Sequence, residues 1–154
     1  MDYIKIIVFF SALFALSCRP ATPEKTHPVE VVRSVADSVI IDSNYTLAEA
    51  LKGTKAPEYI IENLELITVK YWSMDGKIHQ GQLLTNKLIS EDLLDIFDYM
   101  LSVKFPVQRV IPIVKYNWSD ELSMKDNNTY SFCYRNVSFS KHAKGMAVDL
   151  HPFL

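Results

Sequence analysis

The sequence predicts an α+β fold, a small mixed or antiparallel sheet with flanking helices, and three observations support this prediction. First, residues 66–72 and 77–85 are rich in β-branched and aromatic residues, and the Asp75-Gly76 pair between them is typical of a hairpin turn. Second, apolar residues recur at helical spacing over residues 88–101. Third, another apolar run follows over residues 107–116. Hairpin, helix and strand in this order indicate α+β.

Two short helical segments are expected before the hairpin. Thr46 and Glu49 have the spacing of a capping box, and Gly53 is expected to end the helix that they begin. Pro57 is expected to open a second helical turn. The folded domain is therefore predicted to span residues 45–154.

The region after the long helix is predicted to contain two strands separated by a loop. The strand over residues 107–116 includes Pro112, which is typical of an edge strand or a bulge. Residues 118–130 are polar and are predicted to form the loop, and residues 147–150 the last short strand. Small polar side chains are expected to stabilise this loop rather than to take part in catalysis: Ser123, Asn128 and Thr129.

Composition excludes several classes of protein. The 154 residues include 16 Lys and Arg against 18 Asp and Glu, a formal net charge of −2, which argues against a general nucleic-acid-binding protein. Apolar residues make up 49% of the chain, as in an ordinary globular protein. Two cysteines are too few for a disulfide framework or a four-cysteine zinc site.

The N-terminus has the features of a secretory signal. Lys5 precedes an apolar run over residues 6–16, and this run is shorter than the roughly 20 residues of a membrane-spanning helix. Its end resembles a bacterial lipoprotein signal, which implies a signal peptide over residues 1–17 and lipidation of Cys18; a plain signal peptide is the alternative. Both interpretations place the mature chain outside the cytoplasm. The lipoprotein interpretation places it in the cell envelope, periplasmic or on the outer surface, with the lipid anchor as its only attachment to the membrane.

Residues 18–44 are predicted to form a tether between this anchor and the domain. They contain Pro20, Pro23 and Pro28 and show no sustained periodicity before residue 29. The apolar residues over 31–41 are compatible with either a short helix or a short strand, and both interpretations stay open.

The candidate chemistry lies near the C-terminus, in the string Ser140-x-His142-x-x-Gly145-x-Ala-x-Asp149-Leu. Imidazole nitrogen and carboxylate oxygen are both good zinc ligands. Gly145 permits a sharp turn, so that a loop His and a strand Asp can approach one ion. From composition alone, a structural histidine is the safer interpretation.

The same string resembles the zinc-site signature of the M15 metallopeptidases, the D-alanyl-D-alanine carboxypeptidase family. Preceding residues also resemble the bacterial extracellular branch of that family: Gly81-Gln82-Leu83, Phe105-Pro106-Val107, Tyr116, Asp120, Ser123-Met124, Asn128-Thr129, Phe132 and Arg135. The resemblance covers residues 66–154 and implies a DD-peptidase-like fold. It also implies Zn²⁺ as cofactor and a peptidoglycan stem peptide as substrate, hydrolysed by a metal-activated water.

The resemblance assigns roles to individual residues. His142 matches the first zinc ligand and Asp149 the second, while Ser140 falls where a hydrogen bond near the metal or the peptide is expected. Arg135 matches an arginine suited to a terminal carboxylate of the substrate. The alternative for Arg135 is an ion pair with Asp120 or Asp126 that holds the loop.

In the family, the general base and the third ligand follow the aspartate in a Glu-x-x-His arrangement, which is expected downstream of Leu154, so the domain is interpreted as C-terminally incomplete. The chain is then a fragment or frame-shifted product, a degenerate form that binds without cutting, or a form that replaces the missing ligand by His151. The function hypotheses are accordingly a zinc metallopeptidase or a truncated, non-catalytic envelope lipoprotein that retains a zinc half-site.

The remaining histidines and the second cysteine are expected to be structural or exposed. His27 lies in the predicted tether and His79 on the returning strand, where a surface position is expected. Cys133 is expected to be a small buried side chain, since no motif surrounds it.

Overall fold

The computed structural model describes residues 38–137 and 139–150 of the chain. The predicted signal peptide, Cys18, His27, most of the tether and His151 lie outside the described residues. The described elements are, in order, β1 (Ile40–Ile41), α1 (Leu47–Ala50), α2 (Glu58–Ile61), β2 (Leu64–Ser73), β3 (Ile78–Asn86), α3 (Ser90–Ser102), β4 (Pro106–Val107), β5 (Arg109–Val110), the 3-10 helix η1 (Ile113–Tyr116), α4 (Asp120–Lys125), β6 (Asn128–Thr129) and the 3-10 helix η2 (His142–Lys144). This mixture of helices and small sheets confirms the α+β class.

The β2–β3 hairpin forms the centre of the fold, as the sequence predicts. Its strands are antiparallel and in register from Leu64 opposite Asn86 to Trp72 opposite Ile78. Gly76 in the connecting turn has φ +76°, a conformation that glycine adopts without steric cost. The capping box before the hairpin is also confirmed, because the Thr46 side chain and the Glu49 side chain cap each other's backbone N–H groups.

The main sheet has the strand order β1-β3-β2-β4 and is mixed, because β1 runs parallel to β3 and β4 runs parallel to β2. In β1, Ile40 lies opposite His79 of β3. The folded domain therefore begins before residue 45, and the C-terminal end of the predicted tether belongs to the sheet. A parallel pairing between distant segments leaves no local signal in the sequence.

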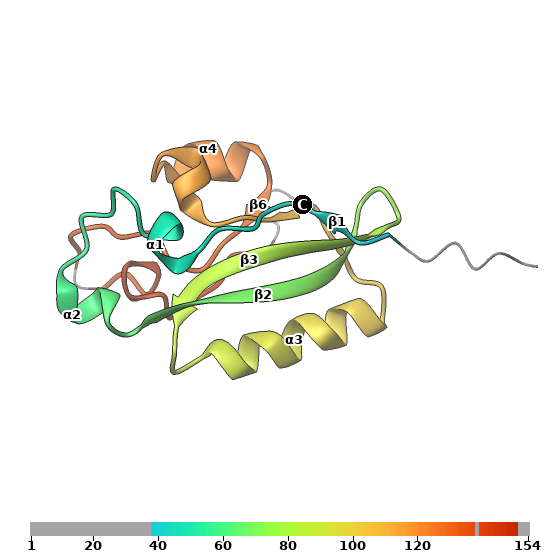
Figure 1. Cartoon of the computed structure of the whole chain (residues 1–154), viewed down its shortest axis with the longest axis horizontal. Coiled ribbons are helices and arrows are strands. Elements are labelled where there is room, and N and C mark those ends of the chain that lie inside the picture. The colour runs from blue at the N-terminus through green and yellow to red at the C-terminus, as the bar shows by residue number, and fades with distance from the viewer. Residues whose placement is uncertain (1–37, 138, 151–154) are drawn as a thin grey trace, which may run out of the picture. The chain divides into compact units, whose positions relative to one another are not determined.

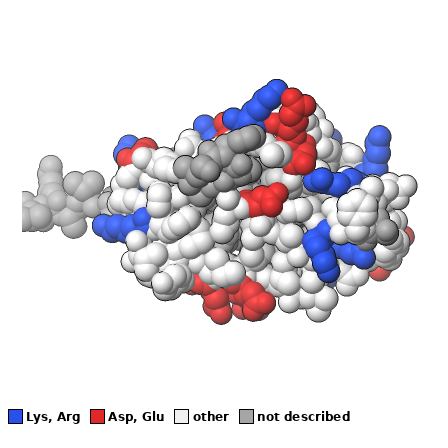
Figure 2. Space-filling model, turned by 180° about the vertical axis from the view of Figure 1, so that it is seen from behind, with Lys and Arg blue, Asp and Glu red and all other residues white. Residues whose placement is uncertain are grey.

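Helix α3 covers one face of this sheet (Figure 1). Its buried residues Leu93, Phe97 and Met100 recur at helical spacing and pack on β2, in a core with these further members: Ile67, Val69, Tyr71, Leu83, Val107 and Val110. The outer side of α3 is acidic, and Figure 2 shows Asp and Glu side chains along that edge of the domain.

The opposite face of β3 is covered by the C-terminal segments. Leu84 packs there with Leu64 and Phe132 in a second core cluster. At Gly81, an added Cβ would lie only 2.0 Å from the carbonyl oxygen of Val110, so β5 packs backbone to backbone against β3. This close approach explains why a glycine stands in the middle of a strand.

Three sequence expectations for the C-terminal half are wrong. Residues 107–116 do not form one strand, because Pro112 breaks the run and precedes the 3-10 helix η1. Residues 118–130 are not an unstructured loop, since Ser119 caps the helix α4 and β6 follows. Residues 147–150 form no strand, and only a single antiparallel bridge joins Asp149 to Tyr130.

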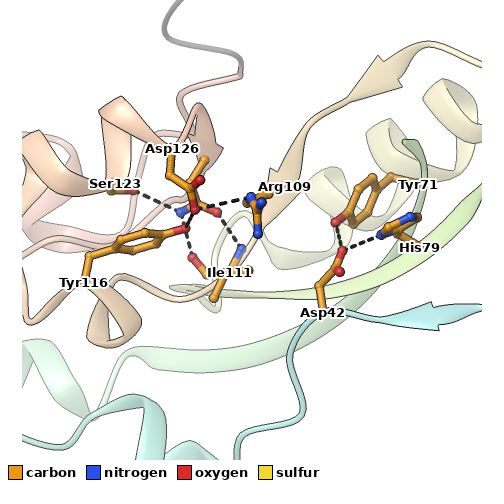
Figure 3. A network of polar contacts seen from close by, with 9 residues as sticks. Asp42, Tyr71, His79, Arg109, Ile111, Tyr116, Ser123 and Asp126 are labelled. Carbon is orange, nitrogen blue, oxygen red and sulfur yellow. Dashed lines mark hydrogen bonds and ion pairs between the residues drawn. The ribbon is translucent and has the colours of Figure 1, made fainter. Parts of the chain in front are cut away.

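Two of the small polar residues of this region, Ser123 and Asn128, are structural, as expected. The buried Asn128 amide donates to the carbonyl oxygen of Ile111 at 2.9 Å and to Oγ of Ser123 at 3.0 Å, and its oxygen accepts from the Ile111 N–H at 2.9 Å. Figure 3 shows Ile111 and Ser123 of this network beside the ion pair of Arg109 with Asp126. Over the described ranges, none of the helices has the length and hydropathy that crossing a bilayer requires.

Candidate metal centre

The loop that carries the M15-like string is fixed to the end of β3 by Gly145. This residue has φ +66°, and an added Cβ would lie 2.8 Å from the backbone nitrogen of Asn86. Its carbonyl oxygen accepts hydrogen bonds from the Asn86 N–H at 3.0 Å, the Thr85 hydroxyl at 3.0 Å and the Ser131 hydroxyl at 3.2 Å. The expectation that Gly145 serves backbone geometry is confirmed.

His142 lies in η2, one turn before this glycine, and its imidazole is held in one orientation. Its backbone carbonyl accepts from the Cys133 N–H at 3.0 Å. On the ring, Nδ1 lies 2.9 Å from the carbonyl oxygen of Ser131. Because a carbonyl oxygen can only accept, Nδ1 carries the proton of this bond, and Nε2 is the nitrogen left for another partner.

Asp149 is brought to His142 by the bridge to Tyr130, in which the Asp149 N–H donates to the Tyr130 carbonyl at 3.2 Å. Its Oδ1 lies 3.2 Å from Nε2 of His142, and the two side chains are 44% and 18% exposed. A carboxylate oxygen, like a carbonyl oxygen, only accepts hydrogen bonds. Nε2 and Oδ1 therefore attract each other only through a second ring proton or through a cation between them. The structure thus brings together the two residues that the sequence assigns to zinc.

Nε2 of His142 and Oδ1 of Asp149 have the spacing of two ligands of one zinc ion. Two ligands held about 2.0 Å from one tetrahedral ion stand about 3.3 Å apart, close to the 3.2 Å between Nε2 and Oδ1. The Nδ1 bond to a backbone carbonyl is the outer contact that metal-bound histidines usually make. Across residues 38–137 and 139–150, no group of three or more His, Cys, Asp and Glu side chains is placed to hold a metal ion.

A polar chain runs from this pair to Arg135. The Tyr130 ring lies 5.4 Å from the His142 ring, and its hydroxyl donates to Asp120. Burial, followed by this hydrogen bond to a carboxylate, raises the pKa of Tyr130 above its ordinary value. The other oxygen of Asp120 accepts from Nη2 of Arg135 at 3.0 Å. Arg135 therefore makes the ion pair with Asp120, one of the two alternatives raised for it, while Asp126 pairs with Arg109.

Ser140 has a local structural contact, because its Oγ accepts from the Ala143 N–H at 3.3 Å and so steadies the turn that carries His142. Cys133 is buried as expected, and this burial raises the pKa of its thiol. The role of Ser140 toward a substrate stays a prediction.

A second polar cluster lies away from this pair, around His79. The expectation of a surface histidine is wrong, since the His79 side chain is only 13% exposed and its Nδ1 lies 2.8 Å from Oδ2 of Asp42. Asp42 also accepts from the Tyr71 hydroxyl, so one carboxylate joins β1 to both strands of the hairpin (Figure 3).

Sequence reasoning missed Ser131, Tyr130 and Asp42. Ser131 acts through its backbone carbonyl, which no side-chain pattern reveals. Tyr130 and Asp120 stand ten residues apart, and only the fold brings them together. Asp42 directly follows the apolar residues Ile40 and Ile41. That apolar run was the one available sign that a strand ends at Asp42.

Comparison with protein-family models, with curated proteins and with solved structures finds no match for this chain.

Proposed function

We propose that this chain is a zinc-dependent peptidase of the cell envelope with a DD-peptidase-like fold, resembling D-alanyl-D-alanine carboxypeptidases and acting on peptidoglycan stem peptides. The observation that carries the proposal is the pairing of His142 Nε2 with Asp149 Oδ1 at 3.2 Å, within a string similar to the M15 signature. The Ser131 carbonyl supports it, because it leaves Nε2 as the coordinating nitrogen.

Zinc, when bound, lowers the pKa of a coordinated water to about 7 and polarises a scissile carbonyl. The chain's own residues orient the reactants. Ser131 holds the imidazole of His142 in one tautomer, and the bridge to Tyr130 holds the carboxylate of Asp149 toward it. Arg135 uses Nη2 for Asp120, and its other N–H donors are suited to the terminal carboxylate of a peptide.

Release of D-alanine tests this function. The full chain, loaded with Zn²⁺, is incubated with a synthetic stem peptide that ends in D-Ala-D-Ala, and free D-alanine is measured with and without a chelator. We expect chelator-sensitive release that is lost in His142→Ala and retained in His27→Gln, a matched change in the predicted tether.

The alternative function, a non-catalytic envelope lipoprotein with a zinc half-site, predicts a different result in the same assay. Zinc would bind to the wild-type chain and depend on His142, but no D-alanine would be released. A folded chain that neither binds zinc nor releases D-alanine would contradict both functions.

A further inference from the structure

A pocket of about 470 Å³ lies beside Arg135 but does not include the His142–Asp149 pair. Three separate segments line it: Lys55 follows α1, Asn117 and Trp118 lie between η1 and α4, and residues 134–136 complete the wall. Its volume falls in the range of about 300–1,000 Å³ that is typical of small-molecule sites. The pocket is therefore large enough for a ligand.

The pocket is cationic. Lys55 and Arg135 line it, and a neighbouring pocket of about 180 Å³ shares Arg135 and adds Lys144. Among the described residues that line the two pockets, none is Asp or Glu, although Asp120 pairs with one nitrogen of Arg135 from outside. Figure 2 shows Lys and Arg side chains at the end of the domain that carries α2. A ligand of these pockets should be an anion.

The aromatic wall of the pocket is held rigidly. Trp118 has φ +64° and follows Asn117 with φ +52°, a conformation that is rare for a bulky residue. The indole Nε1 donates to the Lys52 carbonyl at 3.0 Å, and the ring meets Phe132 edge to face at 6.0 Å. These contacts fix the indole in place, and sustained backbone strain of this kind is concentrated at binding sites.

Aromatic rings line both pockets. Tyr134 belongs to both, and Tyr59 in the smaller pocket is 67% exposed. The negative face of an aromatic ring attracts the weakly positive C–H groups on the face of a sugar ring. The amides of Asn117 and Asn136 in the larger pocket can donate to and accept from hydroxyl and acetamido groups.

We propose that these two adjoining pockets bind an anionic carbohydrate, a sugar ring that carries a carboxylate. The carboxylate pairs with Lys55, and the ring packs against Trp118. The choice of the wall glycan as its source rests on the proposed function, since that glycan bears the stem peptides. The site would then hold a muramic acid residue without a stem peptide, whose carboxylate is free, while the peptide of a neighbouring residue on the strand reaches the His142–Asp149 pair.

Tryptophan fluorescence can measure this binding directly. The chain has two tryptophans, so Trp72→Phe leaves Trp118 as the only reporter. The full chain in this background is titrated, in the presence of a chelator, with the peptide-free disaccharide N-acetylglucosaminyl-N-acetylmuramic acid. Di-N-acetylchitobiose is the neutral control, and a free stem tetrapeptide is the peptide control. We expect saturable binding of the anionic disaccharide, at least about tenfold tighter than either control.

Variants test the role of the cations. Lys55→Gln should weaken binding about threefold or more, and Lys55→Gln with Lys144→Gln further, because charge-assisted contacts are lost. Lys70→Gln is the matched control, since Lys70 is exposed on β2 and lines neither pocket. Its affinity should equal that of the parent chain.

Absence of saturation up to about 10 mM disaccharide would overturn the proposal, as would equal binding of the neutral disaccharide or of the tetrapeptide. Unchanged affinity in both Lys variants would also overturn it. Because the titration needs neither zinc nor turnover, such a failure leaves the D-alanine assay unaffected. Conversely, binding by a chain that releases no D-alanine would support the pocket and contradict the peptidase.

Discussion

The carbonyl oxygen of Gly145 accepts a hydrogen bond from the backbone N–H of Asn86 at 3.0 Å. This bond joins the loop of the candidate metal centre to the last residue of β3, one of the two long strands of the hairpin. The loop of His142 is therefore positioned by a rigid strand, and its geometry depends on how closely the two backbones approach.

Gly145→Ala should destabilise the protein by more than about 2 kcal/mol, because the new Cβ combines a positive φ with a contact of 2.8 Å to the Asn86 nitrogen. Urea unfolding followed by circular dichroism measures this change. Gly76→Ala is the matched control: its φ is +76°, but its Cβ would meet only Trp72 at 3.9 Å. Equal losses in the two variants would mean that the close approach to Asn86 is unimportant.

Asn128→Ala should lower the free energy of unfolding by about 2–4 kcal/mol, because it leaves the buried N–H and carbonyl groups of Ile111 without their side-chain partner. Asn44→Ala, at an exposed position, should change it by less than about 0.5 kcal/mol. Denaturant titration of both variants measures the difference. A loss below about 1 kcal/mol in Asn128→Ala would contradict the structural role assigned to this amide.

The hairpin and α3 were predictable from sequence because their signals are local. Asp75-Gly76 specifies the turn, and the spacing of Leu93, Phe97 and Met100 specifies the buried side of α3. By contrast, α4 is only six residues long and polar, so its periodicity is weak. Ser119 followed by two acidic residues is typical of a helix N-terminus. The polar composition of the segment nevertheless favoured the loop interpretation.

Of the candidate site, only the two proposed zinc ligands were predictable from sequence. The resemblance to the M15 signature assigns His142 and Asp149 as ligands, and the structure brings their side chains to within 3.2 Å of each other. The Ser131 carbonyl and the Asp120 link to Tyr130 depend on the tertiary fold, as does the pairing of Ile40 with His79. Contacts between distant segments carry no periodic signal, and so they had to come from the structure.

Tyr71 should give the protein an alkaline loss of stability. Burial, then its hydrogen bond and proximity to Asp42, raise the pKa of Tyr71 above its ordinary value of 10, while nearby Arg109 acts in the opposite direction. A raised pKa means that the contribution of Tyr71 is complete below pH 10 and declines as the pH rises further, because the unfolded chain loses the phenol proton first. At pH 11 the loss should be about 1.4 kcal/mol relative to pH 8.

Tyr71→Phe isolates this effect because phenylalanine cannot ionise. The difference in unfolding free energy between the wild type and Tyr71→Phe should therefore shrink between pH 8 and pH 11. Tyr59→Phe, at an exposed tyrosine, should show no such change. A wild-type advantage that is constant over this pH range would contradict the raised pKa.

The central claim, that His142 and Asp149 coordinate zinc, is tested most directly by equilibrium dialysis of the full chain against Zn²⁺ followed by metal analysis. We predict about one zinc per wild-type chain and per His27→Gln chain, and loss of that zinc in His142→Ala with the fold retained by circular dichroism. Retention of the same zinc content by a folded His142→Ala chain would contradict the ligand assignment.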